Sequence, residues 1–225
     1  MQQNDKGKSS DNIIAVDGPA GSGKSTIAKL LAKKLSYTYI DTGAMYRALT
    51  LKALRENINL KDGNALIDAA EKTNLDITND KNGSLKVFLE GEDVTGLIRT
   101  PELTEKVSYL AKVEGVRKQM VKLQRKIGKR GNCVIEGRDI TTVVFPRAKY
   151  KFYLDASLKE RAARRYRELK GQTLKDVKED IKIRDRKDKT RAAGPLRKAG
   201  DAICIDTTSM SIEQVVGRIA SYIKP

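Results

Sequence analysis

The stretch GPAGSGKST, residues 18–26, restricts the fold of this chain more than any other feature. It matches the pattern G-x-x-x-x-G-K-[ST] in full, after an apolar run and before a helix-like segment. In that context the glycines let backbone N–H groups face a polyphosphate, Lys24 reaches its β and γ oxygens and Ser25 ligates Mg²⁺. The segment, called the P-loop below, therefore predicts a nucleoside triphosphate site made by Gly18, Pro19, Ala20, Gly21, Ser22, Gly23, Lys24, Ser25 and Thr26.

The P-loop does not identify the group that receives the phosphate, because motor ATPases, GTPase switches and small-molecule kinases share it. The chain contains no histidine, which excludes an imidazole base and the usual histidine-containing zinc sites. The first twelve residues are polar and no segment approaches the roughly 20 apolar residues of a membrane span, so we expect a cytoplasmic protein. Cys133 and Cys204 lie in apolar, strand-like runs, which predicts two buried, reduced thiols.

The net charge of +16 fits either a nucleic-acid binder or a pocket that collects anionic nucleotides. Its distribution favours the second interpretation. Residues 159–198 contain 16 Lys and Arg against 7 Asp and Glu, so more than half of the excess lies in under a fifth of the chain. Such a local concentration suggests a dedicated binding element.

Apolar spacing predicts strands at 12–17, 37–41, 132–136, 149–155 and 202–208, alternating with amphipathic helices. This alternation indicates an α/β fold with a parallel sheet covered by helices. Two segments interrupt this alternation. The first is an insert over about 62–100, with an antiparallel hairpin at 75–80 and 84–90, and the second consists of basic helices over about 157–192. The chain of 225 residues suits a single domain, with a tail at 1–12 and a core at about 13–61, 101–156 and 193–225.

Ligands of such folds bind beyond the carboxyl ends of the strands, so the segments found there are the first candidates for a site. They are DGPAGSGKST, DTGAMYR, EGRD and DASLKERAARR, and each contains a carboxylate. A structural alternative exists for two of them. Asp41 and Thr42 could be helix caps followed by Arg47 on the helix face, and EGRD could be a charged surface turn.

Five segments together resemble the bacterial cytidylate kinases, which transfer the γ-phosphate of ATP to CMP or dCMP. They are IIAVDGPAGSGKST, YIDTGAMYR, VFLEGEDVTGLIRT, EGRDITTVVFP and IKIRDRKDKTRAAGPL, and the resemblance covers about residues 13–223. It implies a nucleoside-monophosphate kinase fold with a five-stranded parallel sheet, an insert on the CMP side and a mobile helical lid. It also implies Mg²⁺ as cofactor, ATP as phosphate donor, and a role in pyrimidine metabolism.

The resemblance implies a role for each residue that matches a family motif. Arg47 would hold the CMP phosphate beside Thr42, while Ser108, Arg117 and Asp139 would meet the cytosine edge. Arg184 and Asp188 would reach the sugar and phosphate. The catalytic group would be Lys24, Arg138, Arg164 and Arg191, of which Arg138 also contacts the CMP phosphate. The chain departs from the family at Thr141, usually glycine, and at Glu136, often aspartate.

The residue types agree with phosphoryl transfer, which needs alignment and charge neutralisation but no general base when the acceptor is already an anionic phosphate. Forked guanidinium groups suit that task, although many lid arginines could simply form surface ion pairs, such as Arg184 with Asp188. The competing class is a basic P-loop ATPase that acts on or binds RNA, for which the chain has few aromatic residues. A kinase of UMP or shikimate is the nearer rival. We expect a monomer whose partners are CMP, dCMP and ATP, with no nucleic acid or membrane required.

Overall fold

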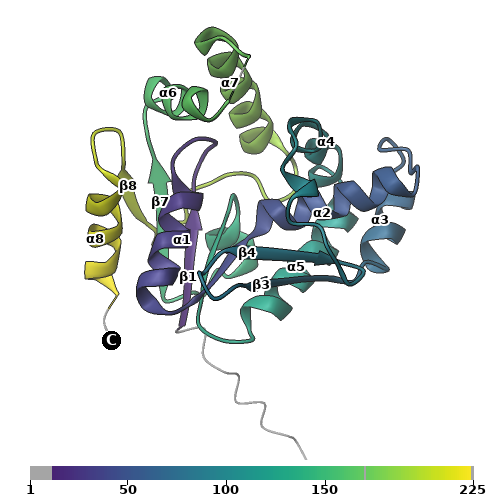
Figure 1. Cartoon of the computed structure of the whole chain (residues 1–225), viewed down its shortest axis with the longest axis horizontal. Helices are drawn as coiled ribbons and strands as arrows, with labels where there is room; N and C mark the ends of the chain where they lie inside the picture. Colours follow the sequence, from purple (N-terminus) through teal and green to yellow (C-terminus); the bar gives the residue numbers. More distant parts are fainter. Residues whose placement is uncertain (1–11, 170, 224–225) are drawn as a thin grey trace, which may run out of the picture.

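A computed structural model describes residues 12–169 and 171–223. Its centre is a five-stranded, wholly parallel sheet in the order β2-β6-β1-β7-β8 (Figure 1). The strands are β1 Ile13–Asp17, β2 Thr38–Asp41, β6 Cys133–Gly137, β7 Tyr150–Asp155 and β8 Ile203–Asp206. All five predicted strands are thus confirmed, with ends that differ by at most two residues.

Strand β1 lies at the centre because its five residues are all buried, as a parallel strand covered on both faces requires. Strands β2 and β6 lie on one side of β1, and β7 and β8, which come later in the chain, lie on the other side. The carboxyl ends of β1 and β6 therefore flank a switch point in the strand order, where ligands of open α/β sheets bind.

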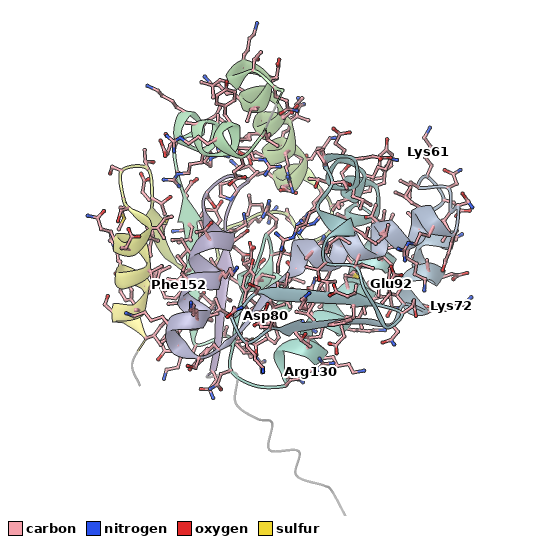
Figure 2. The ribbon with its side chains drawn as sticks, viewed as in Figure 1. Lys61, Lys72, Asp80, Glu92, Arg130 and Phe152 are labelled. Atoms are coloured by element: carbon pink, nitrogen blue, oxygen red, sulfur yellow. The ribbon has the colours of Figure 1, made fainter. Side chains whose placement is uncertain are left out.

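Helices α1 (Lys24–Leu35), α2 (Thr42–Arg55), α5 (Glu114–Gly128) and α8 (Ile212–Tyr222) flank this sheet, and α4 (Pro101–Ala111) packs on α2 and α5 (Figure 1). The amphipathic helices that the sequence predicts between the strands are confirmed. Phe152 of β7, labelled in Figure 2, shows how tightly the layers pack: it is fully buried, and its ring centroid lies 6.1 Å from that of Tyr222 in α8.

The insert comprises α3 (Gly63–Glu71) and a separate three-stranded antiparallel sheet of β3 (Leu75–Asn79), β4 (Leu85–Leu89) and β5 (Glu92–Asp93). The predicted hairpin is confirmed, whereas β5 and the 3₁₀ turn Leu97–Arg99 had no clear sequence signal. Ile77, Val87 and Val94 belong to the same buried cluster as the main sheet. The insert is therefore packed into the main core.

The basic segment forms two helices, α6 (Leu158–Glu168) and α7 (Leu174–Thr190), which lie above the carboxyl ends of β1 and β7 at the top of Figure 1. Ser157 caps α6, and a capping box begins α7. Ala162, Val177 and Ile181 form a small buried cluster of their own, separate from the main core. The two helices, called the lid below, thus have independent packing.

One expectation about the cysteines is wrong. Cys133 is buried, and burial raises the pKa of its thiol to about 12, but Cys204 is exposed. Cys204 lies on β8, the outermost strand of the sheet, and the apolar run around it does not reveal which side chains of an edge strand face solvent. Both thiols are free, and no helix in 12–169 or 171–223 is long and apolar enough to cross a membrane.

Candidate active site

The P-loop connects β1 to α1 with its backbone pressed against the structure around it. A Cβ at Gly18 would collide with the carbonyl oxygen of Leu154, and one at Gly21 would lie 2.9 Å from the carbonyl oxygen of Arg161. Gly23, at φ 86°, caps α1 in the left-handed region that favours glycine. These positions explain why the loop needs glycine at each of them.

Lys24 is the first residue of α1 and is only 5% exposed. Its ammonium donates to the carbonyl oxygen of Pro19 at 3.0 Å, so the lysine lies along its own loop. Burial and the positive charges of Arg138 and Arg184 lower the pKa of Lys24 to about 7. An anionic polyphosphate in the loop would add to the attraction of Glu136, which burial and the two arginines outweigh.

Oxygen ligands gather on the side of the P-loop that faces β2 and β6. The Ser25 side chain lies near the buried carboxyl group of Glu136. The Tyr39 hydroxyl donates to that carboxyl group at 3.0 Å. Burial and the neighbouring charge of Asp41 raise the pKa of Glu136. Hydroxyl and carboxyl oxygens are ligands that suit Mg²⁺, directly or through its water shell, so the residues present fit this ion.

The helix-cap alternative for DTGAMYR is confirmed for Asp41, which lies at the end of β2, but not for Thr42. Asp41 caps α2 by accepting from Ala44 N at 2.9 Å, and its other oxygen accepts from Arg47 at 2.9 Å. The Thr42 hydroxyl donates to the Glu136 carbonyl at 2.7 Å. Nε of Arg47 is buried without a hydrogen-bond partner among the described residues, which leaves a donor for a ligand.

Asp17, which the sequence analysis did not single out, fixes the turn after β6. It is fully buried and accepts from Ile140 N at 2.9 Å, Thr141 N at 2.7 Å and the Thr141 hydroxyl at 2.6 Å. The turn, Ile140–Val144, is π-helical. Thr141 thus supplies a hydroxyl bond to Asp17 that a glycine could not make.

We expect this carboxylate to make stability pH-dependent. Burial outweighs its three donors and raises the pKa of Asp17 to about 6, from 3.8 in an unfolded chain. The native state therefore binds the proton more tightly, and the unfolding free energy falls as pH rises from about 4 to about 6, by up to about 3 kcal/mol. Urea unfolding of the wild type and Asp17→Asn across this range should show the fall in the wild type and a smaller one in the variant. If the unfolding free energies of the two proteins changed with pH in the same way, the proposed titration of Asp17 would be contradicted.

A buried ion pair occupies the place implied for the cytosine edge. Arg117 of α5 and Asp139, at the end of β6, are paired, and Arg117 also donates to the Ala111 carbonyl at 3.3 Å. Gly194 packs directly on this pair, where a Cβ would collide with both side chains, and its φ is 56°. The position of Gly194 explains the glycine in RAAGPL, which the sequence analysis quoted but did not interpret.

Near this pair, the predicted residue Ser108 makes a different contact, and a residue that was not predicted, Tyr46, is also present. Ser108 lies on α4, and its hydroxyl donates to Glu105 of the same helix at 3.1 Å rather than to Arg117 or Asp139. The ring of Tyr46, which was not a candidate, lies 5.7 Å from the guanidinium of Arg117. In the part of the chain that the structure describes, the buried Tyr46 hydroxyl has no hydrogen-bond partner.

The predicted phosphate-binding arginines converge between the lid and β6. Asp188 of α7 accepts from Arg138 at 2.8 Å and lies 3.4 Å from Arg191, whose other nitrogen lies 3.8 Å from Asp139. The suggested surface pair of Arg184 with Asp188 is wrong, since Asp188 forms ion pairs with the other two arginines. Burial and the charge of Arg138 lower the pKa of Arg184 to about 10, because together they outweigh the attraction of Asp188.

Arg164, on α6, is placed against the backbone of the P-loop. It donates to the Ser22 carbonyl at 3.4 Å, to Thr207 O at 2.6 Å and to Glu160 at 2.9 Å. Arg161, one turn earlier, makes similar contacts to Ala20. The sequence analysis missed Arg161, because a helix with four arginines gives no signal for the one that is buried.

The fold and this constellation define a P-loop kinase that acts on a small phosphorylated acceptor. The cytidylate kinase family model matches residues 14–225, and the chain belongs to that family. It is 50% identical over 215 residues to the cytidylate kinase of Caldanaerobacter subterraneus subsp. tengcongensis, covering 94% of each chain. It is 48% identical to the cytidylate kinase of Bacillus subtilis, covering 94% of this chain and 96% of that one.

Among solved structures, an uncharacterized protein from Eubacterium ventriosum resembles this fold. The TM-score is 0.54 at 17% identity, and the match covers 94% of this chain and 97% of that one. At this identity the likeness concerns the fold alone.

Proposed function

We propose that this enzyme transfers the γ-phosphate of ATP to CMP and dCMP, giving CDP and dCDP. The observation that carries the proposal is that a P-loop, an arginine cluster around Asp188 and a buried Arg117–Asp139 pair lie together at one end of the sheet. About 50% identity to curated cytidylate kinases supports the acceptor. Nothing in the site favours the RNA-binding alternative.

In this proposal the P-loop and Lys24 bind the ATP phosphates, and Arg164 holds the loop from behind. Mg²⁺, bound through Ser25 and the phosphates, would neutralise charge on the transferring group. Arg47, Arg138 and Arg184 lie around the place of the CMP phosphate, and Arg191 reaches the group between the two nucleotides. Guanidinium forks grip phosphate oxygens through paired hydrogen bonds, which aligns donor and acceptor.

The base would be selected by Asp139, which can accept from the N4 amino group of cytosine. The neighbouring Arg117 holds Asp139 in place through their ion pair. Arg184 and Asp188 would meet the ribose and phosphate, and Ser108 would have to turn from Glu105 to reach the base. We also propose that the enzyme is a monomer and requires no nucleic acid.

A coupled assay of ADP release tests the proposal. With Mg²⁺-ATP, CMP and dCMP should support turnover, and UMP, AMP and shikimate should support far less. Equal or better turnover with UMP, AMP or shikimate would overturn the assignment of the acceptor.

We expect the lid helices α6 and α7, within the segment of about 157–192 that the sequence singled out, to close over both nucleotides. The positively charged side chains of this segment repel one another, and two bound anionic nucleotides would offset that repulsion and favour closure. Closure would also exclude water from the γ-phosphate. Hydrogen exchange should show α6 and α7 protected by an ATP analogue together with CMP, and less by either alone. Protection that appears elsewhere while the lid stays unchanged would show that this segment is not a lid.

A further inference from the structure

Two buried side chains outside the groups assigned above join the lid to the P-loop. They are Arg161 of α6 and Asp185 of α7, which are 7% and 8% exposed. They form an ion pair with a nitrogen–oxygen distance of 2.6 Å. Neither was implied by the family motifs, and neither lies in the cluster around Asp188.

The pair holds both backbone groups of Ala20, a P-loop residue. Arg161 Nη1 donates to the Ala20 carbonyl at 3.0 Å, and Ala20 N donates to Asp185 Oδ1 at 3.3 Å. Arg161 Nε donates to the Ala156 carbonyl at 2.9 Å, which fixes the guanidinium at the end of β7. The P-loop is thus bonded to side chains from both lid helices at one residue.

The contact between P-loop and lid leaves little free space. A Cβ at Gly21 would lie 2.9 Å from the Arg161 carbonyl, so the loop packs directly on the backbone of α6. A shift of the lid helices therefore moves atoms that touch the P-loop. Tightly packed elements transmit such shifts instead of absorbing them.

The turn of α7 that contains Asp185 also contains the residues proposed to bind the acceptor nucleotide. Arg184 precedes Asp185 directly, and Asp188 follows it by three residues, less than one helical turn away. Asp188 is bonded to Arg138, beside the place of the CMP phosphate. One rigid segment thus contacts the donor loop through Asp185 and the acceptor site through Arg184 and Asp188.

We propose that Arg161 and Asp185 are positioning residues that couple binding of the acceptor nucleotide to the geometry of the P-loop. This inference rests on the proposed function, since it requires CMP to bind beside α7. An acceptor that binds Arg184 and Asp188 also holds Asp185 against Ala20, and the ATP-bound loop holds α7 in return. By linkage, each nucleotide then tightens the binding of the other by the same factor.

Calorimetric titration of the full chain measures this coupling as the ratio of the Kd for CMP without and with a saturating, nonhydrolysable ATP analogue and Mg²⁺. We expect a wild-type ratio of about 5 or more. Asp185→Ala should bring it close to 1, while the Kd for CMP alone changes little. Asp180→Ala removes an exposed carboxylate from the same helix and should keep the wild-type ratio.

A purely structural role predicts other results. Removal of one partner from a buried pair destabilises a protein, whereas an apolar replacement of both is tolerated. In the double variant Arg161→Met, Asp185→Leu a structural role predicts recovery of both the melting temperature and the ratio. Our proposal predicts recovery of the melting temperature with a ratio near 1. If Asp185→Ala does not fold, the double variant and Asp185→Asn, which preserves side-chain volume but removes the charge, decide the question.

Unchanged coupling in folded Asp185→Ala, or a wild-type ratio of 1, would overturn the inference and leave the proposed function standing. Absence of CMP binding to the wild type would overturn both. The two failures are therefore distinguishable in one set of titrations.

Discussion

Lys24→Met should fold normally and lose about 10²–10³-fold or more in kcat, because the developing charge on the transferring phosphate loses its main protein partner. Stability should not suffer. Lys24 is buried among positive charges that lower its pKa, so an apolar side chain of similar length relieves a cost of folding. Steady-state kinetics and a thermal melt together check both parts.

Lys33→Met is the matched control, since it removes an exposed ammonium from the last turn of the same helix. It should leave kcat unchanged. Near-normal turnover of Lys24→Met would show that the P-loop does not hold the phosphate donor in the assumed way.

Asp139→Ala should lower kcat/KM for CMP far more than for UMP and so reduce the CMP to UMP ratio by about 10–100-fold. Cytosine presents an amino donor where uracil presents a carbonyl acceptor, so the carboxylate of Asp139 favours CMP and repels O4 of UMP. A site built around such a hydrogen bond discriminates strongly, because the wrong base leaves buried groups unpaired. Parallel kinetics with both nucleotides measure the ratio.

The alternative is that Asp139 only maintains the turn after β6. The contacts of the turn argue against this: Val143 N donates to the backbone carbonyl of Asp139 at 2.8 Å, and the Asp139 side chain does not cap the turn. Its carboxylate instead faces Arg117. If the alternative is correct, the variant loses activity on both substrates by one factor, or melts earlier, and the ratio stays constant. Asp139→Asn preserves the volume and controls for a packing defect.

The sequence sufficed to predict the order of strands and helices, because the apolar residues of each core element follow a clear helical or strand spacing. Ile13–Asp17 is continuously buried, and the hairpin around Gly83 alternates in β4 as a half-buried strand does. The two-residue strand β5 was not predictable, since pairing with β4 alone defines it. Exposure of Cys204 was missed for a related reason: position at the edge of a sheet is a property of the tertiary fold.

The site residues that belong to sequence motifs were predictable. Those whose role depends on contacts between distant parts of the chain were not. The P-loop, Arg117 and Asp139 stand in recognisable segments, and the structure brings the last two together. Asp17 could not be recognised as an acceptor for Thr141, because 124 positions separate them. The partner of Asp188 was likewise misjudged: helical spacing suggested Arg184, but the fold supplies Arg138, 50 positions away.

Transfer of label from [γ-³²P]ATP tests the central claim most directly. With Mg²⁺ and CMP, the label should appear in CDP, in step with ADP release, and ADP release should be negligible when CMP is omitted. RNA should not replace CMP. ADP release without CMP, with the label in inorganic phosphate and stimulation by RNA, would contradict the account and identify the chain as a nucleic-acid-dependent ATPase.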